Sequence, residues 1–536
     1  MILRAAITIA FITVLNGPTD AADFAKVEFA EARRNATLSA RALEQAHDLL
    51  VAWAGRKDSE SSLLRSGAEG DRWTVATTAA ELYTSLVAAA WLTDRPLYDG
   101  LLRETLRDEI ALTSRLAALP DDYDLDRKQF VRTTTQSDRI IDASARYAIG
   151  LSRAVSHTGA SPWSDRMRSL VDAAFLRANV VTDFAEGPLP SERAAVNGRY
   201  LRLLPLLSRE SGDDGYLYYA RRIGDAYCVG VLPKNGGLPA DRWDFGSDRS
   251  RDAELTLDDG GVAIVEGLVS LYAAELADES SRADVYRPSI SSMFDAMFSH
   301  GLTSGGHVSR RIDPDGRGGY SIDRRRASPH EARLLAAAAR FGSLSGNAAY
   351  VTHAHRGADN LTTKDGAGSL LELAILADQL GSESFTARVW QAIERGIQTP
   401  PPPRIAEEDD ADRLLWLTTL SVDSGAGTRL TPWRSDVRWG ASVRSDTLRV
   451  VLQADNRWEG HLFFASPNSL SHPGYPRRYV IEPDALYLIR LSDSATLTTW
   501  QGRHLMDGFS VRLNTNQELS LTVVRQPPAP ASLSDR

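Results

Sequence analysis

The alternation of short and long connections between helices constrains the fold of this chain more than any other feature. From about residue 23 to residue 423, apolar residues recur at steps of three and four, which is the period of amphipathic helices. Short links are typical of antiparallel helical neighbours, whereas links longer than about 12 residues inside a compact domain are usually functional. The short links lie at 93–96, 157–159, 211–213, 278–280, 342–344 and 381–383, and the longer ones at 55–72, 120–137, 183–190, 232–257, 301–328 and 359–364. Six units therefore share one plan of long loop, helix, short turn and helix.

These units predict a closed ring of paired helices. The inner helices are expected to begin near Trp73, Asp138, Glu192, Asp258, Pro329 and Asp365. A closed ring places the long loops at one end, together with the N-termini of the inner helices. An open solenoid is the competing arrangement, but its repeats are usually more regular in length than these. We therefore predict a mainly α fold, an (α/α)6 toroid of helical hairpins over residues 22–425.

The character of the chain changes after the run of prolines at 400–403, which predicts a stiff spacer. From about Trp433 onward, segments with a period of two are separated by Asp, Asn, Gly and Pro. The clearest segments lie at 448–452, 460–464, 486–489, 509–513 and 519–523. Short strands in this number indicate a small antiparallel β-sandwich at 426–526, and the tail at 527–536 is expected to be disordered.

The first 21 residues have the features of a secretory signal peptide. Arg4 gives a positive start, an apolar stretch follows at 7–15, and small residues at 19–21 fit a cleavage site. An uncleaved anchor is the alternative, although the apolar stretch is too short to span a bilayer as a stable helix. No later segment is expected to cross a membrane. The mature protein is therefore expected to be secreted or periplasmic.

Charge and cysteine content exclude several classes of partner. The net charge of −9 argues against nucleic acid or an anionic membrane surface. Cys228 is the only cysteine, so the chain has neither an intrachain disulfide nor a cluster of thiolate metal ligands. His353 and His355 are two residues apart, which turns them to different helix faces, and no suitable third ligand is evident. No metal and no cofactor is expected.

The succession of six helical hairpins and a small β-domain resembles the six-hairpin glycosidase-like superfamily. That superfamily includes alpha/alpha toroid glycoside hydrolases and the toroidal domains of heparinase-like polysaccharide lyases. The resemblance is one of architecture and covers nearly the whole mature chain, but it includes no catalytic signature. It implies a polysaccharide or oligosaccharide as substrate, and it indicates the substrate class better than the reaction.

In such a ring, the site lies where the long loops meet the inner-helix N-termini. The candidate catalytic residues there are Asp258, Asp259, His330 and Glu331. Two adjacent carboxylates can hold one proton at a raised pKa, as a general acid requires. Their alternative role is a helix N-cap, although the glycines that follow cost roughly 1 kcal/mol each relative to Ala unless a ligand or another backbone comes close. A neutral His330 can act as a base or bind a sugar hydroxyl, and its alternative is a surface histidine.

The same rule selects candidate substrate-binding residues. They are Asn197, Arg199, Tyr200, Asp241, Arg242, Trp243, Tyr320 and Arg326. A loop tryptophan often stacks on a sugar face, but Trp243 is equally well explained as cover for the rim of the helical core. The alternative for Tyr200 is that it is an ordinary aromatic residue of the hydrophobic core. The arginine run that ends at Arg326 is usually a solvated patch, but beside Arg199 and Arg242 it can recognise uronic or sulfated sugars.

Three functions fit these residues. The first is hydrolysis of an acidic or complex polysaccharide or oligosaccharide by paired carboxylates, with Asp258 or Asp259 facing Glu331, Asp241 or Asp365. The second is β-elimination of a uronate glycan by a heparinase-like lyase, in which Asn197, Tyr200, His330 and an arginine fill the roles of base and charge stabiliser. The third is a glycan-binding protein without turnover. We favour the hydrolase.

Overall fold

The computed structural model describes residues 29–65, 70–361, 367–398, 407–444, 446–465, 470–472, 475–476, 479–492 and 497–526. The signal peptide predicted at 1–21, the proline run at 400–403 and the tail predicted at 527–536 lie outside the described residues.

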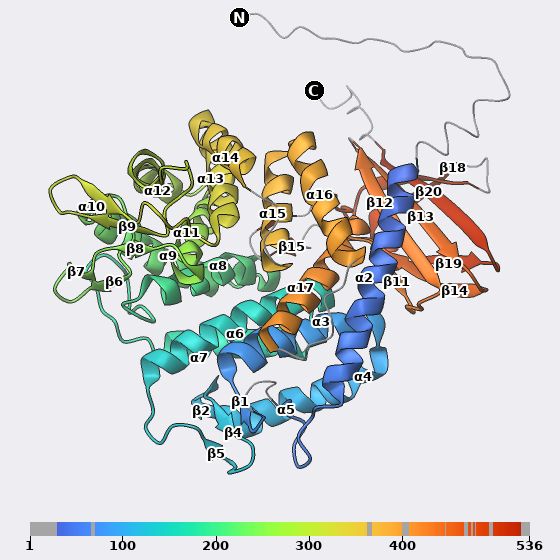
Figure 1. The fold of residues 1–536 in the computed structure, drawn as a ribbon, viewed down its shortest axis with the longest axis horizontal. Helices are drawn as coiled ribbons and strands as arrows, with labels where there is room; N and C mark the ends of the chain where they lie inside the picture. Colours follow the sequence, from blue (N-terminus) through green and yellow to red (C-terminus); the bar gives the residue numbers. More distant parts are fainter. Residues whose placement is uncertain are drawn as a thin grey trace, which may run out of the picture.

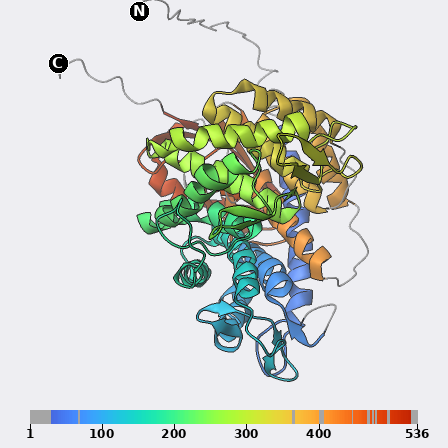
Figure 2. The ribbon, with the colours of Figure 1, turned by 90° about the vertical axis from the view of Figure 1, so that its left-hand side faces the viewer.

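Six helical hairpins follow one another along the chain, as the loop lengths predict (Figure 1). The inner members are η1 (Val75–Tyr83) continuing into α3 (Thr84–Thr93), α6 (Ser137–Thr158), α8 (Ala194–Ser211), α11 (Asp259–Ala277), α13 (Glu331–Ser345) and α15 (Ala367–Leu380). The outer members are α4 (Arg95–Asp99) with α5 (Leu101–Thr113), α7 (Pro162–Leu176), α9 (Asp214–Asp225) with η2 (Ala226–Val231) and α10 (Leu232–Lys234), α12 (Arg282–His300), α14 (Ala348–Asn360) and α16 (Glu383–Gln398). In Figure 2 the hairpins from the middle of the chain, green to yellow, lie above the blue and cyan ones.

The last helix of this region closes the ring, and the first helix packs on its outer side. Successive inner helices contact one another from η1 to α15, and α17 (Glu407–Ser424) packs against both α15 and η1. On its outer side α17 packs against α2 (Ala30–Ala54), which lies beside it in Figure 1. The helices therefore form a closed α/α toroid rather than an open solenoid, as predicted, and α2 with α17 forms a seventh helix pair beside the six predicted hairpins.

The inner helices pack tightly against one another, and two of them are strongly apolar. A Cβ atom at Gly198 of α8 would lie 2.3 Å from the backbone nitrogen of Ile264 in α11, so these two helices approach closely only because glycine stands there. Val75–Thr93 and Asp259–Ala277 reach the length and mean hydropathy of membrane spans, 1.2 and 1.4, and 78% of each is buried. Burial within the ring accounts for that hydropathy, and the lack of a membrane span stays an expectation.

The long loops carry short antiparallel strands. β1 (Arg72–Trp73), β4 (Tyr123–Asp124) and β5 (Gln129–Phe130) form one sheet, and β8 (Leu255–Thr256), β9 (Arg311–Pro314) and β10 (Tyr320–Ile322) form another. β2 (Ser114–Leu116) pairs with β3 (Leu119–Pro120), and β6 (Arg242–Asp244) with β7 (Arg249–Asp252). Because β8 ends just before α11 begins, its pairing with β9 fixes the start of an inner helix.

Antiparallel sheets follow the helical region. The larger sheet has the order β12 (Val437–Arg444), β13 (Thr447–Ala454), β20 (Gln517–Arg525), β17 (Leu486–Leu491) and β18 (Leu497–Gln501). A smaller one contains β11 (Arg429–Thr431), β14 (Trp458–Phe463) and β19 (Phe509–Leu513), and the remaining elements are β15 (Leu470–His472), β16 (Tyr475–Pro476) and α18 (Gly502–Asp507). Residues of both larger sheets share one apolar cluster. The β-sandwich and its boundaries at 425 and 426 stay predictions.

Helix α2 also joins the ring to the larger sheet. The Nδ2 of Asn35 donates a hydrogen bond of 2.7 Å to the backbone oxygen of Ala441 in β12. At Gly440 a Cβ atom would lie 2.1 Å from the backbone nitrogen of Ala36, so the strand and the helix are in backbone contact. The sheet thereby packs on the helix pair that closes the ring.

Candidate active site at the centre of the helical ring

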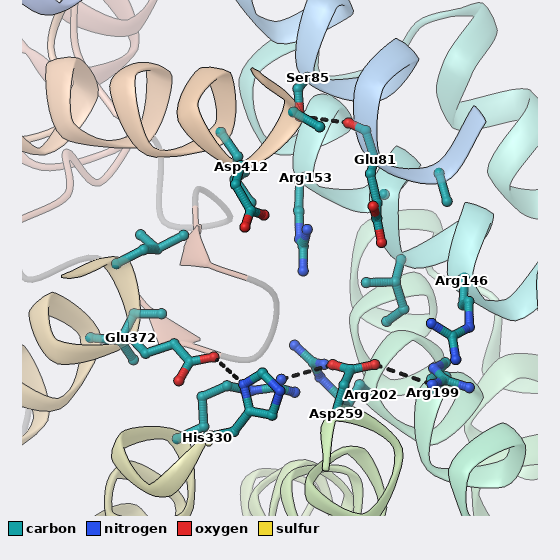
Figure 3. A pocket seen from close by; sticks show the side chains of 18 of the residues that line it. Glu81, Ser85, Arg146, Arg153, Arg199, Arg202, Asp259, His330, Glu372 and Asp412 are labelled. Carbon is teal, nitrogen blue, oxygen red and sulfur yellow. Dashed lines mark hydrogen bonds and ion pairs between the residues drawn. The ribbon is translucent and has the colours of Figure 1, made fainter. Parts of the chain in front are cut away.

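A pocket of about 330 Å³ lies at the centre of the ring, and every inner helix contributes to its wall. Its cationic side chains are Arg146, Arg153, Arg199, Arg202, Arg333 and, when protonated, His330. Its acidic side chains are Glu81, Asp259, Glu372 and Asp412. Figure 3 shows Asp259, His330 and Glu372 on one side of the pocket, facing Glu81 and Asp412 on the other. The pocket therefore presents carboxylates from opposite sides of an arginine-rich space.

Asp259 is held between two arginines. Its Oδ1 accepts a hydrogen bond of 2.8 Å from Arg333, and its Oδ2 accepts one of 3.1 Å from Arg199. Burial alone would raise the pKa of this carboxyl group, but the charges of Arg333 and Arg199 hold the pKa well below its ordinary value. Asp259 is therefore ionised across the neutral range and is poorly suited to hold the proton of a general acid.

A second acid, Glu266, anchors the arginines from behind. It is buried in α11, and both of its oxygens accept hydrogen bonds from Arg333, at 3.0 and 2.6 Å. The Nε of Arg202 lies 3.2 Å from the same carboxylate. Burial would raise the pKa of Glu266, but Arg202 and Arg333 lower it. The result is a fixed charge network, so Arg333 reaches the pocket in one preset position.

His330 and Glu372 form an acid–base pair on the same side of the pocket. The Nδ1 of His330 lies 2.7 Å from Oε1 of Glu372, and the imidazole is 28% exposed. Burial lowers the pKa of His330, but the hydrogen bond and charge of Glu372 outweigh it and raise the pKa above its ordinary value of 6.5. Because Nδ1 is engaged, Nε2 is the ring nitrogen that can exchange a proton with a ligand.

Asp258, next to Asp259 in sequence, has a structural role. Its Oδ1 accepts hydrogen bonds from the backbone nitrogens of Gly260 and Gly261, at 3.0 and 3.2 Å, so it is the N-cap of α11. A Cβ atom at Gly261 would lie 2.0 Å from the backbone oxygen of Thr256, and one at Gly260 would lie 2.7 Å from Ala195 Cβ. The N-cap alternative is confirmed for Asp258, and close protein packing explains the two glycines.

Glu331 lies outside the pocket lining. Its side chain is 5% exposed, and it accepts hydrogen bonds from the backbone nitrogen of Val308 at 2.8 Å and pairs with Nδ1 of His307 at 2.9 Å. Burial raises its pKa more than these contacts lower it. Glu331 therefore ties the loop at 301–328 to the start of α13. Of the four candidate catalytic residues, the structure brings only Asp259 and His330 into the pocket.

Among the predicted substrate-binding residues, Arg199 alone lines the pocket. Asn197 is buried and donates to the backbone oxygen of Ser191 at 2.7 Å. Tyr200 is fully buried and its hydroxyl donates to the backbone oxygen of Ile141, at 3.3 Å, which confirms the core alternative. The side chains of these two residues pack between α8 and its neighbours and do not line the pocket.

The predicted loop residues also lie elsewhere. Trp243 is 3% exposed within the main apolar cluster, which confirms its alternative as cover for the core. Asp241 accepts a hydrogen bond from the backbone nitrogen of Thr256, and Arg242 forms an ion pair with Glu192. The hydroxyl of Tyr320 donates a hydrogen bond to the backbone oxygen of Gly236. Arg326 is exposed, and Asp365 lies outside the described residues. Asp241, Arg242 and Tyr320 therefore order the loops around the ring.

Sequence reasoning missed the residues that lie deeper along the inner helices. They are Glu81, Ser85, Arg146, Arg153, Arg202, Arg333, Glu372 and Asp412. A signal was present: Arg202 stands among leucines, and Arg333 directly precedes a pair of leucines, in helices predicted to face the core. A charge on an apolar helix face requires a partner or a pocket. In the described residues, no group of three His, Cys, Asp or Glu side chains is arranged to hold a metal ion.

No protein-family model and no curated protein matches this chain. Some solved structures are similar to it. An inactive variant of the alpha-1,6-mannanase of Salegentibacter sp. HEL1_6, in complex with alpha-1,6-mannotetrose, is similar over 63% of this chain and 99% of its own, with 11% sequence identity and a TM-score of 0.43. The cellobiose 2-epimerase of Spirochaeta thermophila is similar over 76% of this chain and 99% of its own, with 12% identity and a TM-score of 0.41.

An unsaturated glucuronyl hydrolase specific for heparin is similar over 53% of this chain and 86% of its own, with 11% identity and a TM-score of 0.39. All three are carbohydrate-active enzymes, but at these identities and TM-scores the likeness assigns neither reaction nor substrate to this chain. In architecture, the chain resembles the six-hairpin glycosidase-like superfamily, because its helical hairpins close into an alpha/alpha toroid.

Proposed function

We propose that this protein is a carbohydrate-active enzyme and that it hydrolyses glycosidic bonds in a polysaccharide or oligosaccharide. The observation that carries the proposal is the convergence of a proton donor and carboxylates on opposite sides of one pocket. Glycoside hydrolysis needs an acid on one side of the scissile bond and a carboxylate on the other. The pocket supplies both kinds of group from different inner helices.

His330 is the proton donor in this proposal. Because Glu372 raises its pKa above 6.5, more of the imidazole is protonated near neutral pH than in an ordinary histidine. The proton leaves from Nε2 toward the oxygen of the departing sugar, while Glu372 stabilises the cationic ring until the transfer. Glu81 or Asp412, on the facing side, either activates a water molecule or attacks the sugar directly.

Asp259 has a different role from the one first expected of it. A carboxylate that shares two arginines is a weak base, since protonating it breaks both ion pairs. Its fixed negative charge is suited to accept hydrogen bonds from sugar hydroxyls and to stabilise positive charge that develops on the sugar ring. Asp258 and Glu331 have no part in this mechanism.

β-Elimination of a uronate glycan is the second candidate. The arginines of the pocket favour it, because they can stabilise the negative charge that develops when a base removes the proton α to a carboxylate. His330 in its neutral form is the available base. Asn197 and Tyr200 do not support it, since both are buried in the packing of α8. A glycan-binding protein without turnover is the third candidate.

The proposed location is outside the cytoplasm, either secreted or periplasmic, and it rests on the character of the first 21 residues. N-terminal sequencing of the protein recovered from its native host tests it. A mature start near Ala22 is expected, and a chain that retains residues 1–21 contradicts the proposed export.

A panel of neutral, uronic and sulfated polysaccharides tests the reaction. New reducing ends and the ultraviolet absorbance of a new C=C bond are followed in the same sample. Reducing ends without the absorbance are expected from hydrolysis. Both signals together would overturn hydrolysis in favour of elimination, and binding without either signal would indicate a glycan-binding protein.

A further inference from the structure

Within the part of the chain that the structure describes, Arg153 differs from the other arginines of the pocket in forming no ion pair. It projects from α6 into the space between the two acidic sides of the pocket, and no interaction reaches its head group in Figure 3. Its Nε is buried without a hydrogen-bond partner. Among the described residues, none forms an ion pair with its guanidinium.

The neighbouring arginines are neutralised by protein carboxylates. Arg199 contacts Asp142 at 2.5 Å and Asp259 at 3.1 Å. Arg333 contacts both Glu266 and Asp259. Asp259 and Glu266 are therefore already paired with other arginines, and neither forms an ion pair with Arg153.

An uncompensated cation in such a position is costly. Removing a charge from water without a partner destabilises the folded state, and proteins usually pair or neutralise such groups. Burial and the nearby charges of Arg202 and Arg333 lower the pKa of Arg153 more than the carboxylates of Asp259 and Glu81 raise it, so the attraction of these two acids does not offset its burial. An arginine stays cationic even so. A ligand anion is the partner that the geometry leaves room for.

We propose that Arg153 binds an oxyanion of the substrate, a carboxylate or a sulfate ester on a sugar ring, beside the His330–Glu372 pair. A planar guanidinium donates two parallel hydrogen bonds to such a group, which gives orientation as well as affinity. Arg146, 40% exposed and 3.9 Å from Asp142, adds positive charge at the edge of the same pocket. The claim that the ligand is a sugar rests on the proposed function. The claim that the ligand carries an oxyanion rests on Arg153.

Calorimetric titration of the full chain tests the inference without requiring turnover. The probes are D-glucuronate, D-glucose 6-sulfate and D-glucose, and the variants are Arg153→Gln and, as control, Arg177→Gln, an exposed arginine at the end of α7. We expect the anionic probes to bind about 10- to 100-fold more tightly than glucose, and Arg153→Gln alone to remove that preference. Stronger binding of glucuronate identifies a uronic acid, and stronger binding of the sulfate identifies a sulfated sugar.

Three results would overturn the inference: equal binding of anionic and neutral probes, equal binding by wild type and Arg153→Gln, or no binding of either anion. Its failure is separable from that of the proposed reaction. If Arg153 binds an anion but no glycan is turned over, the anion subsite is supported and the proposed hydrolysis is not. If neutral glycans are turned over equally by the wild type and Arg153→Gln, the proposed hydrolysis is supported and the anion subsite is not.

Discussion

Two buried arginine sites in this molecule are built from the same residue types but differ in how their charges are matched. Arg166 of α7 and Glu109 of α5 form a closed pair, with side chains 2% and 0% exposed. Arg166 donates to both oxygens of Glu109, at 2.6 and 3.0 Å, and to the backbone oxygen of Ala118 at 2.8 Å. Both oxygens of Glu109 and all three guanidinium nitrogens of Arg166 are therefore engaged within the protein.

The central pocket has the opposite arrangement. Asp259 is shared between two arginines, Arg153 forms no ion pair with any described residue, and His330 keeps one ring nitrogen for a ligand. A closed ion pair leaves no charged group free to bind a substrate. A cluster of unequally paired charges around a cavity does leave such groups. Buried charge is common to both sites, so we expect incomplete pairing beside the pocket, rather than burial, to be the feature that indicates a functional site.

The largest expected effect is on catalysis at His330. His330→Gln removes the proton donor, so kcat/KM should fall by about 10²- to 10⁴-fold on whichever glycan the panel identifies. His504→Gln, an exposed histidine in α18, is the matched control and should keep wild-type turnover. Equal rates in the wild type and His330→Gln would remove His330 from the mechanism.

The stability of the two arginine sites should respond in opposite ways. Glu109→Gln leaves Arg166 buried without its counterion, and the free energy of unfolding should fall by about 3–5 kcal/mol. Arg153→Met removes a cation that has no ion pair among the described residues, so its free energy of unfolding should equal or exceed that of the wild type. Urea denaturation measures both, and similar losses in the two variants would break the comparison.

Asp259 and Asp258 offer a test on adjacent carboxylates. Asp259→Asn removes the charge between Arg199 and Arg333, and turnover should fall by about 10²-fold. Asp258→Asn should keep wild-type turnover and stability, because Asn caps a helix about as well as Asp. Steady-state rates of the two variants decide the matter, and near-normal activity of Asp259→Asn would refute its assignment to the site.

The His330–Glu372 pair predicts a dependence on pH. A raised His330 pKa means that the donor is protonated at low pH and that activity falls as pH rises through that pKa. In Glu372→Gln the pKa drops, so the alkaline limb of kcat/KM should move to lower pH. An unchanged limb would show that another group titrates.

Stability should follow the same titration. The pair stabilises the fold fully below the unfolded-state pKa of His330, near its ordinary value of 6.5, and loses that contribution as pH rises through the higher folded-state value. The difference in unfolding free energy between wild type and Glu372→Gln should therefore shrink from acid to alkaline pH.

The smallest effect is expected at the cap itself. Asp258→Ala removes the acceptor of the Gly260 and Gly261 backbone nitrogens, and it should cost about 1 kcal/mol of unfolding free energy with no loss of turnover. Urea denaturation beside a rate measurement checks both halves. A loss of turnover at unchanged stability would return Asp258 to the catalytic set.

The helical hairpins could be predicted from the sequence because the two features that indicate them, loop length and the spacing of apolar residues, can each be read from a short stretch of chain. The same reasoning placed Asp259, His330 and Arg199 correctly at the pocket, since residues at inner-helix N-termini and one or two turns into them reach the centre of a ring. It failed for Tyr200 and Trp243 because an aromatic residue near a predicted site has the same sequence signature whether it faces a ligand or the core. Only the packing of α8 and of the loop at 232–257 separates those roles.

The sequence by itself determined the order of helices, their paired arrangement and the polar character of the inner-helix N-termini. The tertiary structure alone decided which charges meet. Glu81 comes from η1 and Asp412 from α17, and they share a pocket only because α17 closes the ring against η1. Helical period shows which face of a helix is polar, but the partner of that face depends on which helices become neighbours. For that reason Arg153 appears in the sequence as one arginine among many, and only the closed ring shows that no described residue forms an ion pair with it.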